Sequence, residues 1–195
     1  MRIVGVALLI GLLHQSAVFA QEVFVVGKGG LSSYGSAYFG NLAGSGGDQN
    51  WKSGPIVALG ARMRTSEAFA FEGLVEYSTH RYAPREWENP PSNNPKNSIL
   101  EVTTTGRLSI GIFGGTYLDI IGGVGLSSQH KDERTTVQGN SVYTTPGRQA
   151  VDFGAILGTG LEVRVSRSIE LSLEGSWRMR FYVTPVVQLG VAYAL

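Results

Sequence analysis

The sequence lacks cysteine altogether, and it lacks a marked excess of charge of either sign. Without cysteine, no disulfide can hold the fold together and no lipid can be attached to a cysteine thiol. The 16 basic and 15 acidic residues nearly cancel, so the chain offers no electrostatic basis for binding nucleic acid. Beyond residue 20 it also lacks an apolar run long enough to cross a membrane as a helix.

The first twenty residues have the pattern of a secretory signal peptide. Arg2 precedes the apolar run at positions 3–13, and small residues follow as far as Ala20. This pattern predicts cleavage after Ala20 and a mature domain over 21–195 with equal numbers of basic and acidic residues. An uncleaved membrane helix is the alternative, but His14 interrupts the run well short of the ~20 residues that a span requires.

The stretch RSIELSLEGSWRMRF, which begins at Arg167, alternates with a period of two. From Ile169 every odd position is apolar or glycine, and every even position is polar, four of them charged. A period of two predicts a β-strand, because a helix needs apolar residues at steps of three and four. Similar alternation predicts eight strands in all. They are expected over Val23–Ser33, Pro55–Arg64, Glu67–Ser78, Ile99–Phe113, Thr116–Ser127, Val151–Val165, Arg167–Phe181 and Pro185–Leu195.

The connections between these strands alternate in length. Tight turns are expected around Thr65-Ser66, Gly114-Gly115 and Ser166-Arg167, and no linker divides the chain into two domains. The long polar connections are expected over Gly40–Gly54, His80–Ser98 and Ser128–Ala150. Short turns at one end and long loops at the other are typical of an up-and-down antiparallel barrel in an outer membrane.

Alternation alone fits two architectures. A soluble barrel or sandwich buries its apolar face, whereas a membrane barrel turns that face to lipid and keeps the polar face in its lumen. Aromatic residues near the strand ends favour the membrane barrel, because aromatic rings suit the two membrane–water interfaces. These interface aromatics are Phe69, Tyr77, Phe113, Phe153, Trp177 and Tyr193.

The charges on the polar faces also favour the membrane barrel. They are nearly equal in number, as a narrow lumen requires, because an unpaired buried charge is very unfavourable. An interior of eight strands is just wide enough for side chains to fill it. Several glycines fit where strands curve tightly or where bulky lumen residues need room, namely Gly122, Gly123, Gly125, Gly158 and Gly160. The predicted lumen charges are Lys28, Arg62, Arg64, Glu72, Glu76, Glu101, Arg107, Asp119, Asp152, Glu162, Arg164, Glu170, Glu174, Arg178 and Arg180.

The leader, the eight strands, the loop asymmetry and the closing stretch VVQLGVAYAL resemble the small eight-stranded outer-membrane barrels of the OmpA, OmpX and opacity-protein type. The resemblance covers 21–195 and implies a transmembrane β-barrel in a Gram-negative outer membrane. Such barrels usually end in an aromatic residue that helps their assembly. This chain departs from that pattern at Leu195, while Tyr193 keeps an aromatic on the same face.

Some barrels that this chain resembles are enzymes on lipid A, and the resemblance therefore raises the alternative of an acyl-transfer site. His130 follows Ser128 in LSSQHKDER, and His80 lies in EYSTHRYAP, each with serine and acidic neighbours. Such a set can pair a histidine base with a serine nucleophile. The histidine–serine string of the lipid A deacylases is absent, and a histidine in a polar loop is more often simply solvated. No pattern predicts a metal site or a cofactor.

The leading hypothesis is therefore a non-enzymatic, monomeric outer-membrane anchor whose loops meet the exterior for adhesion, host-factor binding or envelope integrity. A lipid A-modifying enzyme is the alternative, and a small-solute pore is the third hypothesis. Outer-membrane lipid and lipopolysaccharide are the expected partners, because basic loop residues can pair with phosphates. These loop residues are Arg81, Arg85, Lys131, Arg134 and Arg148.

Overall fold

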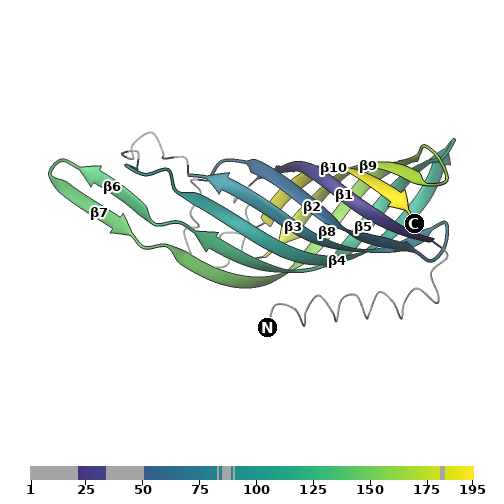
Figure 1. Ribbon diagram of the computed structural model, residues 1–195, viewed down its shortest axis with the longest axis horizontal. Coiled ribbons are helices and arrows are strands. Elements are labelled where there is room, and N and C mark those ends of the chain that lie inside the picture. Colours follow the sequence, from purple (N-terminus) through teal and green to yellow (C-terminus); the bar gives the residue numbers. More distant parts are fainter. Residues whose placement is uncertain (1–21, 34–50, 83, 85–88, 90, 181–182) are drawn as a thin grey trace.

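The computed structural model describes residues 22–33, 51–82, 84, 89, 91–180 and 183–195, which form a barrel of long tilted strands (Figure 1). The expected leader, 1–20, lies outside these residues, as does most of the expected connection Gly40–Gly54. Within the described part of the chain, no helix is long and apolar enough to cross a membrane.

Eight strands close the barrel in the order β1-β10-β9-β8-β5-β4-β3-β2, and every neighbouring pair is antiparallel. The order follows the chain all the way round, as expected of an up-and-down barrel. The barrel strands are β1 (Glu22–Ser32), β2 (Gly54–Arg64), β3 (Phe69–Arg81), β4 (Lys96–Phe113), β5 (Thr116–Lys131), β8 (Arg148–Arg164), β9 (Ile169–Met179) and β10 (Val183–Ala194).

The first and last barrel strands pair with each other and close the sheet. Their register runs from Phe24 opposite Ala194 to Ser32 opposite Val186. Closure leaves no barrel strand without a neighbour on either side, so the backbone N–H and C=O groups find partners within the sheet. The predicted all-β, eight-stranded closed fold is confirmed.

The sheet is apolar on its outside and charged on its inside. In β9, Leu173 is 47% exposed on the outer wall, whereas its neighbour Glu174 is 6% exposed in the interior. The same alternation runs along β3, β4 and β8. An apolar wall that surrounds the whole barrel is far larger than the patches that soluble proteins expose, so this surface requires lipid around it.

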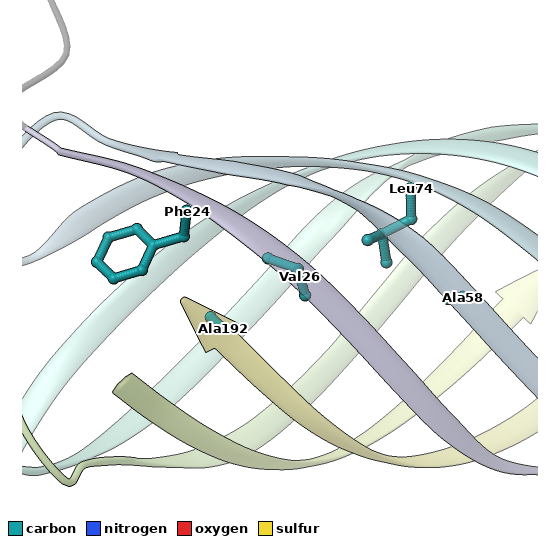
Figure 2. Packing of buried hydrophobic residues seen from close by; sticks show 5 residues of the cluster. All are labelled: Phe24, Val26, Ala58, Leu74 and Ala192. Atoms are coloured by element: carbon teal, nitrogen blue, oxygen red, sulfur yellow. The ribbon is translucent and has the colours of Figure 1, made fainter. Parts of the chain in front are cut away.

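One part of the interior is apolar rather than charged. Phe24, Val26, Ala58, Leu74 and Ala192 form a buried cluster on β1, β2, β3 and β10 (Figure 2). The sequence did not indicate this cluster, because the glycines of the first strand blur its alternation. The Arg64 guanidinium lies over the Phe24 ring at 4.9 Å from its centroid, so the cluster packs directly against the charged part of the interior.

The prediction of a loop over Ser128–Ala150 is wrong, because most of this segment forms strands. β5 continues to Lys131, β8 begins at Arg148, and a hairpin of β6 (Arg134–Gln138) and β7 (Ser141–Thr145) lies between them. This hairpin projects beyond the barrel at the end opposite the C-terminus (Figure 1). Threonine, valine and tyrosine favour strands here, and Gly139, with φ of 59°, allows the two-residue turn.

The expected connection His80–Ser98 is also shorter than predicted, because β3 ends at Arg81 and β4 begins at Lys96. At the other end of the barrel the predicted tight turns are present. Gly114 and Gly115, with φ of 49° and 79°, form the two-residue turn between Phe113 and Thr116. A hairpin turn with positive φ at both positions is favoured by glycine.

A charge placed on the outer wall tests its exposure to lipid. Leu108 lies near the middle of the outward face of β4 and is 45% exposed. We expect Leu108→Arg to lower the free energy of unfolding in lipid vesicles by ~2–4 kcal/mol, because arginine is unfavourable in the hydrocarbon core. Val165→Arg, next to the tight turn that follows β8, should cost only about 0–1 kcal/mol. Equal and small effects of the two changes in urea titrations would contradict a lipid-facing wall.

Candidate functional site

Ion pairs occupy the barrel interior along most of its length. Nearest the tight turns, Arg62 of β2 donates to three carboxylates from three other strands. Its Nε and Nη2 lie 3.0 and 2.9 Å from Glu72 Oε2, and its Nη1 lies 2.6 Å from Glu162 and 3.0 Å from Glu170. Arg64 also pairs with Glu162 and Glu170. These contacts join β2, β3, β8 and β9 across the interior.

Arg164 of β8 lies at the edge of this group. Its Nε is 3.6 Å from Glu162 and 3.5 Å from Glu170, and Nη1 donates to the Tyr117 hydroxyl at 2.9 Å. Its guanidinium also stacks over the Tyr117 ring at 3.9 Å from the centroid. At the tight-turn end of the interior, Arg164 therefore makes ionic contacts with two glutamates and a cation–π contact with Tyr117.

The middle of the interior is held by a lysine and an arginine. Lys28 Nζ donates to Glu72 at 2.5 Å and to Glu174 at 2.7 Å. Arg107 Nη1 donates to the other oxygen of Glu174 at 2.7 Å, and its Nη2 donates to Asp119 at 2.5 Å. Glu174 is thus shared between two cations that come from opposite parts of the sheet.

Toward the hairpin end, Arg178 binds Glu76 with two parallel hydrogen bonds of 2.8 Å. The same guanidinium donates to Glu101 at 2.7 Å, and Arg180 also pairs with Glu101. Bidentate pairs of this kind are among the stronger charge-assisted hydrogen bonds. Asp152 faces the interior at this end, yet it forms no ion pair among the described residues, and its Oδ1 lacks a hydrogen-bond partner.

Small inward residues make room for these long side chains. A Cβ atom at Gly125 would lie 2.6 Å from Glu101 Oε1, and one at Gly190 would lie 3.1 Å from Lys28 Cγ. Both distances are shorter than van der Waals contact allows. The glycines therefore set how far the charged side chains can extend across the barrel.

His80 is placed differently from its expected solvated position in a loop. It lies in β3 with no exposed surface, because the strand continues past Ser78 and turns the imidazole inward. Its Nε2 is 3.2 Å from Ser32 Oγ and its Nδ1 is 3.2 Å from the Lys52 carbonyl oxygen. His80 lies beyond the apolar outer band, and burial lowers the pKa of its imidazole, as does nearby Arg180. The buried pair joins β1, β3 and the segment that precedes β2.

Ser128 and His130 both lie on the outward face of β5, but they do not form an acyl-transfer pair. His130 Nδ1 is 3.4 Å from Gln149 Nε2, and its Nε2 is 3.6 Å from Asp132 Oδ1. Ser128 forms no hydrogen bond with either ring nitrogen in the described part of the structure. Both nitrogens therefore have other neighbours, and the serine is not positioned for activation by the imidazole.

The predicted interface aromatics lie on the outer surface of the barrel, and the described basic loop residues lie at its hairpin end. All six aromatics, listed above, have exposed side chains on the barrel. Arg134 donates to the Tyr82 hydroxyl at 2.5 Å and stacks over the Tyr82 ring at 4.8 Å. Lys131 and Arg148 are opposite each other on β5 and β8. Arg85 lies outside the described residues.

An aromatic cluster at the hairpin end was not predicted. Trp51, Tyr82 and Ile99 are buried together, with the Trp51 and Tyr82 rings edge to face at 5.6 Å between centroids. Trp51 lies in a predicted long connection and Tyr82 in another, where no periodic pattern exists to pair them. Only the long-range bridge between the two residues reveals the contact.

By sequence, the chain matches no protein-family model and no curated protein. By structure it is similar to Ail, the attachment invasion locus protein of Yersinia pestis, at 12% identity and a TM-score of 0.53, over 90% of this chain and 99% of Ail. Neisserial surface protein A is 12% identical, with a TM-score of 0.47 over 88% of this chain and 96% of that protein. The N-terminal barrel domain of OprF from Pseudomonas aeruginosa is 12% identical, with a TM-score of 0.44 over 90% and 99% of the two chains.

The closed eight-stranded topology and the similarity to Ail show the fold of the small transmembrane barrels. The predicted resemblance to this structural class is confirmed. At this level of identity the similarity extends to the fold and not to a shared ligand or activity.

Loss of one interior carboxylate tests the ion pairing. Glu174→Gln preserves the shape of the side chain but removes the charge that Lys28 and Arg107 share. We expect the free energy of unfolding of the variant to be about 3 kcal/mol or more below that of the unchanged protein, because two buried cations lose a partner. Glu133→Gln, an exposed site near the hairpin, is the matched control. Indistinguishable urea midpoints for the two variants would refute the structural role of the pairing.

Proposed function

We propose that the protein is a non-enzymatic anchor in the outer membrane that presents the β6–β7 hairpin to the exterior for attachment to another surface. In this proposal the leader 1–20 is removed on export, and the mature chain 21–195 inserts as a monomeric barrel. The proposal also assigns the hairpin end to the cell exterior. The observation that carries the proposal is the β6–β7 hairpin, which projects beyond the barrel with exposed apolar side chains.

The hairpin carries three exposed apolar side chains. Val137 is 46%, Val142 is 64% and Tyr143 is 58% exposed. Val137 and Val142 are opposite each other on one face of the hairpin, and Tyr143 lies on the other face. Exposed apolar residues on both faces of a projecting element favour an interaction surface. Tyrosine in particular contributes strongly to protein interfaces.

Contacts with the segment before β4 support the hairpin from the side. Ser92 N donates to Thr135 O at 2.8 Å, and Asn93 Nδ2 donates to Glu133 O at 2.6 Å. Thr135 N in turn donates to Asn93 Oδ1 at 3.1 Å. A supported hairpin loses less conformational entropy on binding than a free loop does, which favours a role in recognition.

The interior supports an anchor rather than a pore. All seven predicted interior cations pair with carboxylates, and these pairs cross the barrel at successive levels. Moving a solute through would require breaking buried pairs, which is strongly unfavourable. The fold similarity to Ail, whose name refers to attachment and invasion, agrees with an adhesive role.

Removal of the apolar hairpin side chains tests the attachment role. We expect cells that express Val142→Ser with Tyr143→Ser to attach to cultured epithelial cells several-fold less than cells with the unchanged protein. Val165→Ser is the control, because Val165 is 60% exposed at the other end of the barrel. Heat-modifiable migration of the membrane fraction should be the same for all three.

Two results would contradict this proposal. The first is attachment that is no greater with the unchanged protein than with an empty vector. The second is full attachment by the hairpin variant at equal surface abundance. Either result would contradict the adhesive role but not the barrel fold.

The interior makes a separate prediction for conductance. In planar bilayers the purified protein should show no discrete channel openings, because ion pairs cross the lumen. A large-pore porin reconstituted in the same way is the positive control. Stable openings that scale with salt concentration would support a pore and contradict the anchor.

A further inference from the structure

Three basic residues form a row at the hairpin end of the barrel, on β3, on β4 and on the segment that precedes β2. Arg81, at the end of β3, is directly opposite Lys96 at the start of β4. Lys52 lies on the other side of Arg81, and its backbone N–H donates to the Arg81 carbonyl oxygen at 2.9 Å. All three residues are exposed. We call Lys52, Arg81 and Lys96 the basic row.

No carboxylate of the described residues neutralises the basic row. Among the described residues, none of its three charged groups lies within ion-pair distance of a carboxylate. Asp132 ends the row beyond Lys96, but its Oδ2 accepts the Lys96 backbone N–H at 3.0 Å and its Oδ1 is directed toward His130. Like charges directly opposite each other weaken a sheet, so an external anion would relieve the repulsion.

The height of the row on the barrel indicates where this anion lies. On β3 the outward apolar side chains end at Tyr77, and on β4 they end at Leu100, the residue opposite Tyr77. Thr79 and Ser98 follow, and the Tyr77 hydroxyl donates to Ser98 Oγ at 3.2 Å. Arg81 is four residues beyond Tyr77, roughly 13 Å along a tilted strand and about 10 Å along the membrane normal. This is the level of lipid headgroups rather than of acyl chains.

The basic row occupies one sector of the barrel, and two further cations, Lys131 and Arg148, lie opposite each other on β5 and β8. Where the sheet continues onto β5 and β8, the outward residues opposite Ser98 are His130 and then Gln149, which contact each other. At the tight-turn end, the exposed charges Glu67 and Arg167 are of opposite sign.

We propose that the basic row binds the phosphates of a lipid headgroup in the outer leaflet, on the outside of the barrel. Adjacent strands are about 4.8 Å apart, so three cations extend over about 10 Å. That span suits a headgroup with more than one phosphate, which charge-assisted hydrogen bonds from lysine and arginine hold well. Hydroxyl groups of Thr79 and Ser98 lie just below the row and can contact the same headgroup. This inference rests on the proposed placement in the outer membrane.

Binding of bisphosphorylated lipid A tests the inference directly. The mature protein, folded in a neutral non-ionic detergent, is titrated with lipid A in mixed micelles of the same detergent by calorimetry. The triple variant Lys52→Gln, Arg81→Gln, Lys96→Gln should bind at least about tenfold more weakly, since it loses three charge-assisted contacts. Arg167→Gln, which removes an exposed cation at the other end, should bind as the unchanged protein does.

Further titrations identify the source of the phosphate. Lipid A with one phosphate should bind the unchanged protein severalfold more weakly than the bisphosphorylated form, and the difference should shrink in the triple variant. Inorganic phosphate at millimolar concentration should not displace the lipid. Displacement by inorganic phosphate, or tighter binding of soluble heparin than of lipid A, would overturn a lipid site.

Equal affinity of the unchanged protein and the triple variant for lipid A would also overturn the inference. Heat-modifiable migration confirms that each variant is folded before titration. If the triple variant does not fold, Lys96→Gln alone replaces it, with an expected weakening of about threefold. Loss of the lipid site in a folded protein leaves the anchor proposal standing. Absence of the protein from the outer-membrane fraction of cells would instead refute the anchor itself.

Discussion

Charge pairing in a closed interior is the constraint on which the rest of this structure depends. A carboxylate or guanidinium removed from water is strongly destabilising unless an opposite charge and further hydrogen bonds accompany it. Here Glu72 and Glu174 each accept from more than one cation, and these cations come from different strands. Glu76 accepts from Arg178 and from the neutral amide of Gln188. These contacts bring distant strands together. They also favour one register over others, because a slip of one residue would turn every charge outward.

The same constraint explains the outer surface and the ends. Because charges fill the inside, the apolar residues must face outward, and closure of β1 on β10 removes the free edges that lipid would not tolerate. At the hairpin end the strands extend beyond the apolar outer wall, and β4, β5 and β8 are the longest of them. The end then divides into two sectors with different surfaces. The hairpin rises above β5 and β8, and the basic row lies beside it on β3 and β4 at the level of lipid headgroups.

Alternation in the sequence was enough to predict the strands, the tight turns and the closed barrel, because a period of two assigns each residue to one of two faces. It could not give the strand register, so it did not show that Glu174 faces Lys28 and Arg107 while Arg178 binds Glu76 and Glu101. The sequence places His80 in a loop because the apolar residues of its strand end at Tyr77, although the strand itself continues to Arg81. The β6–β7 hairpin was missed because a polar segment of threonines reads as a loop unless its turn is recognised. The basic row depends on pairing between Arg81 and Lys96, residues 15 positions apart, which no local pattern reveals.

The absence of cysteine makes the sidedness of the sheet directly measurable, since any single cysteine gives one defined labelling site. Spin labels placed in turn at each position of β9, in protein folded into lipid vesicles, report their accessibility to oxygen dissolved in lipid and to a water-soluble nickel complex. The account predicts a period of two, with high oxygen accessibility at Leu171, Leu173 and Trp177. The intervening positions should be shielded from both reagents. Outward positions shielded from oxygen, with the nickel complex reaching Glu170 and Glu174, would contradict it.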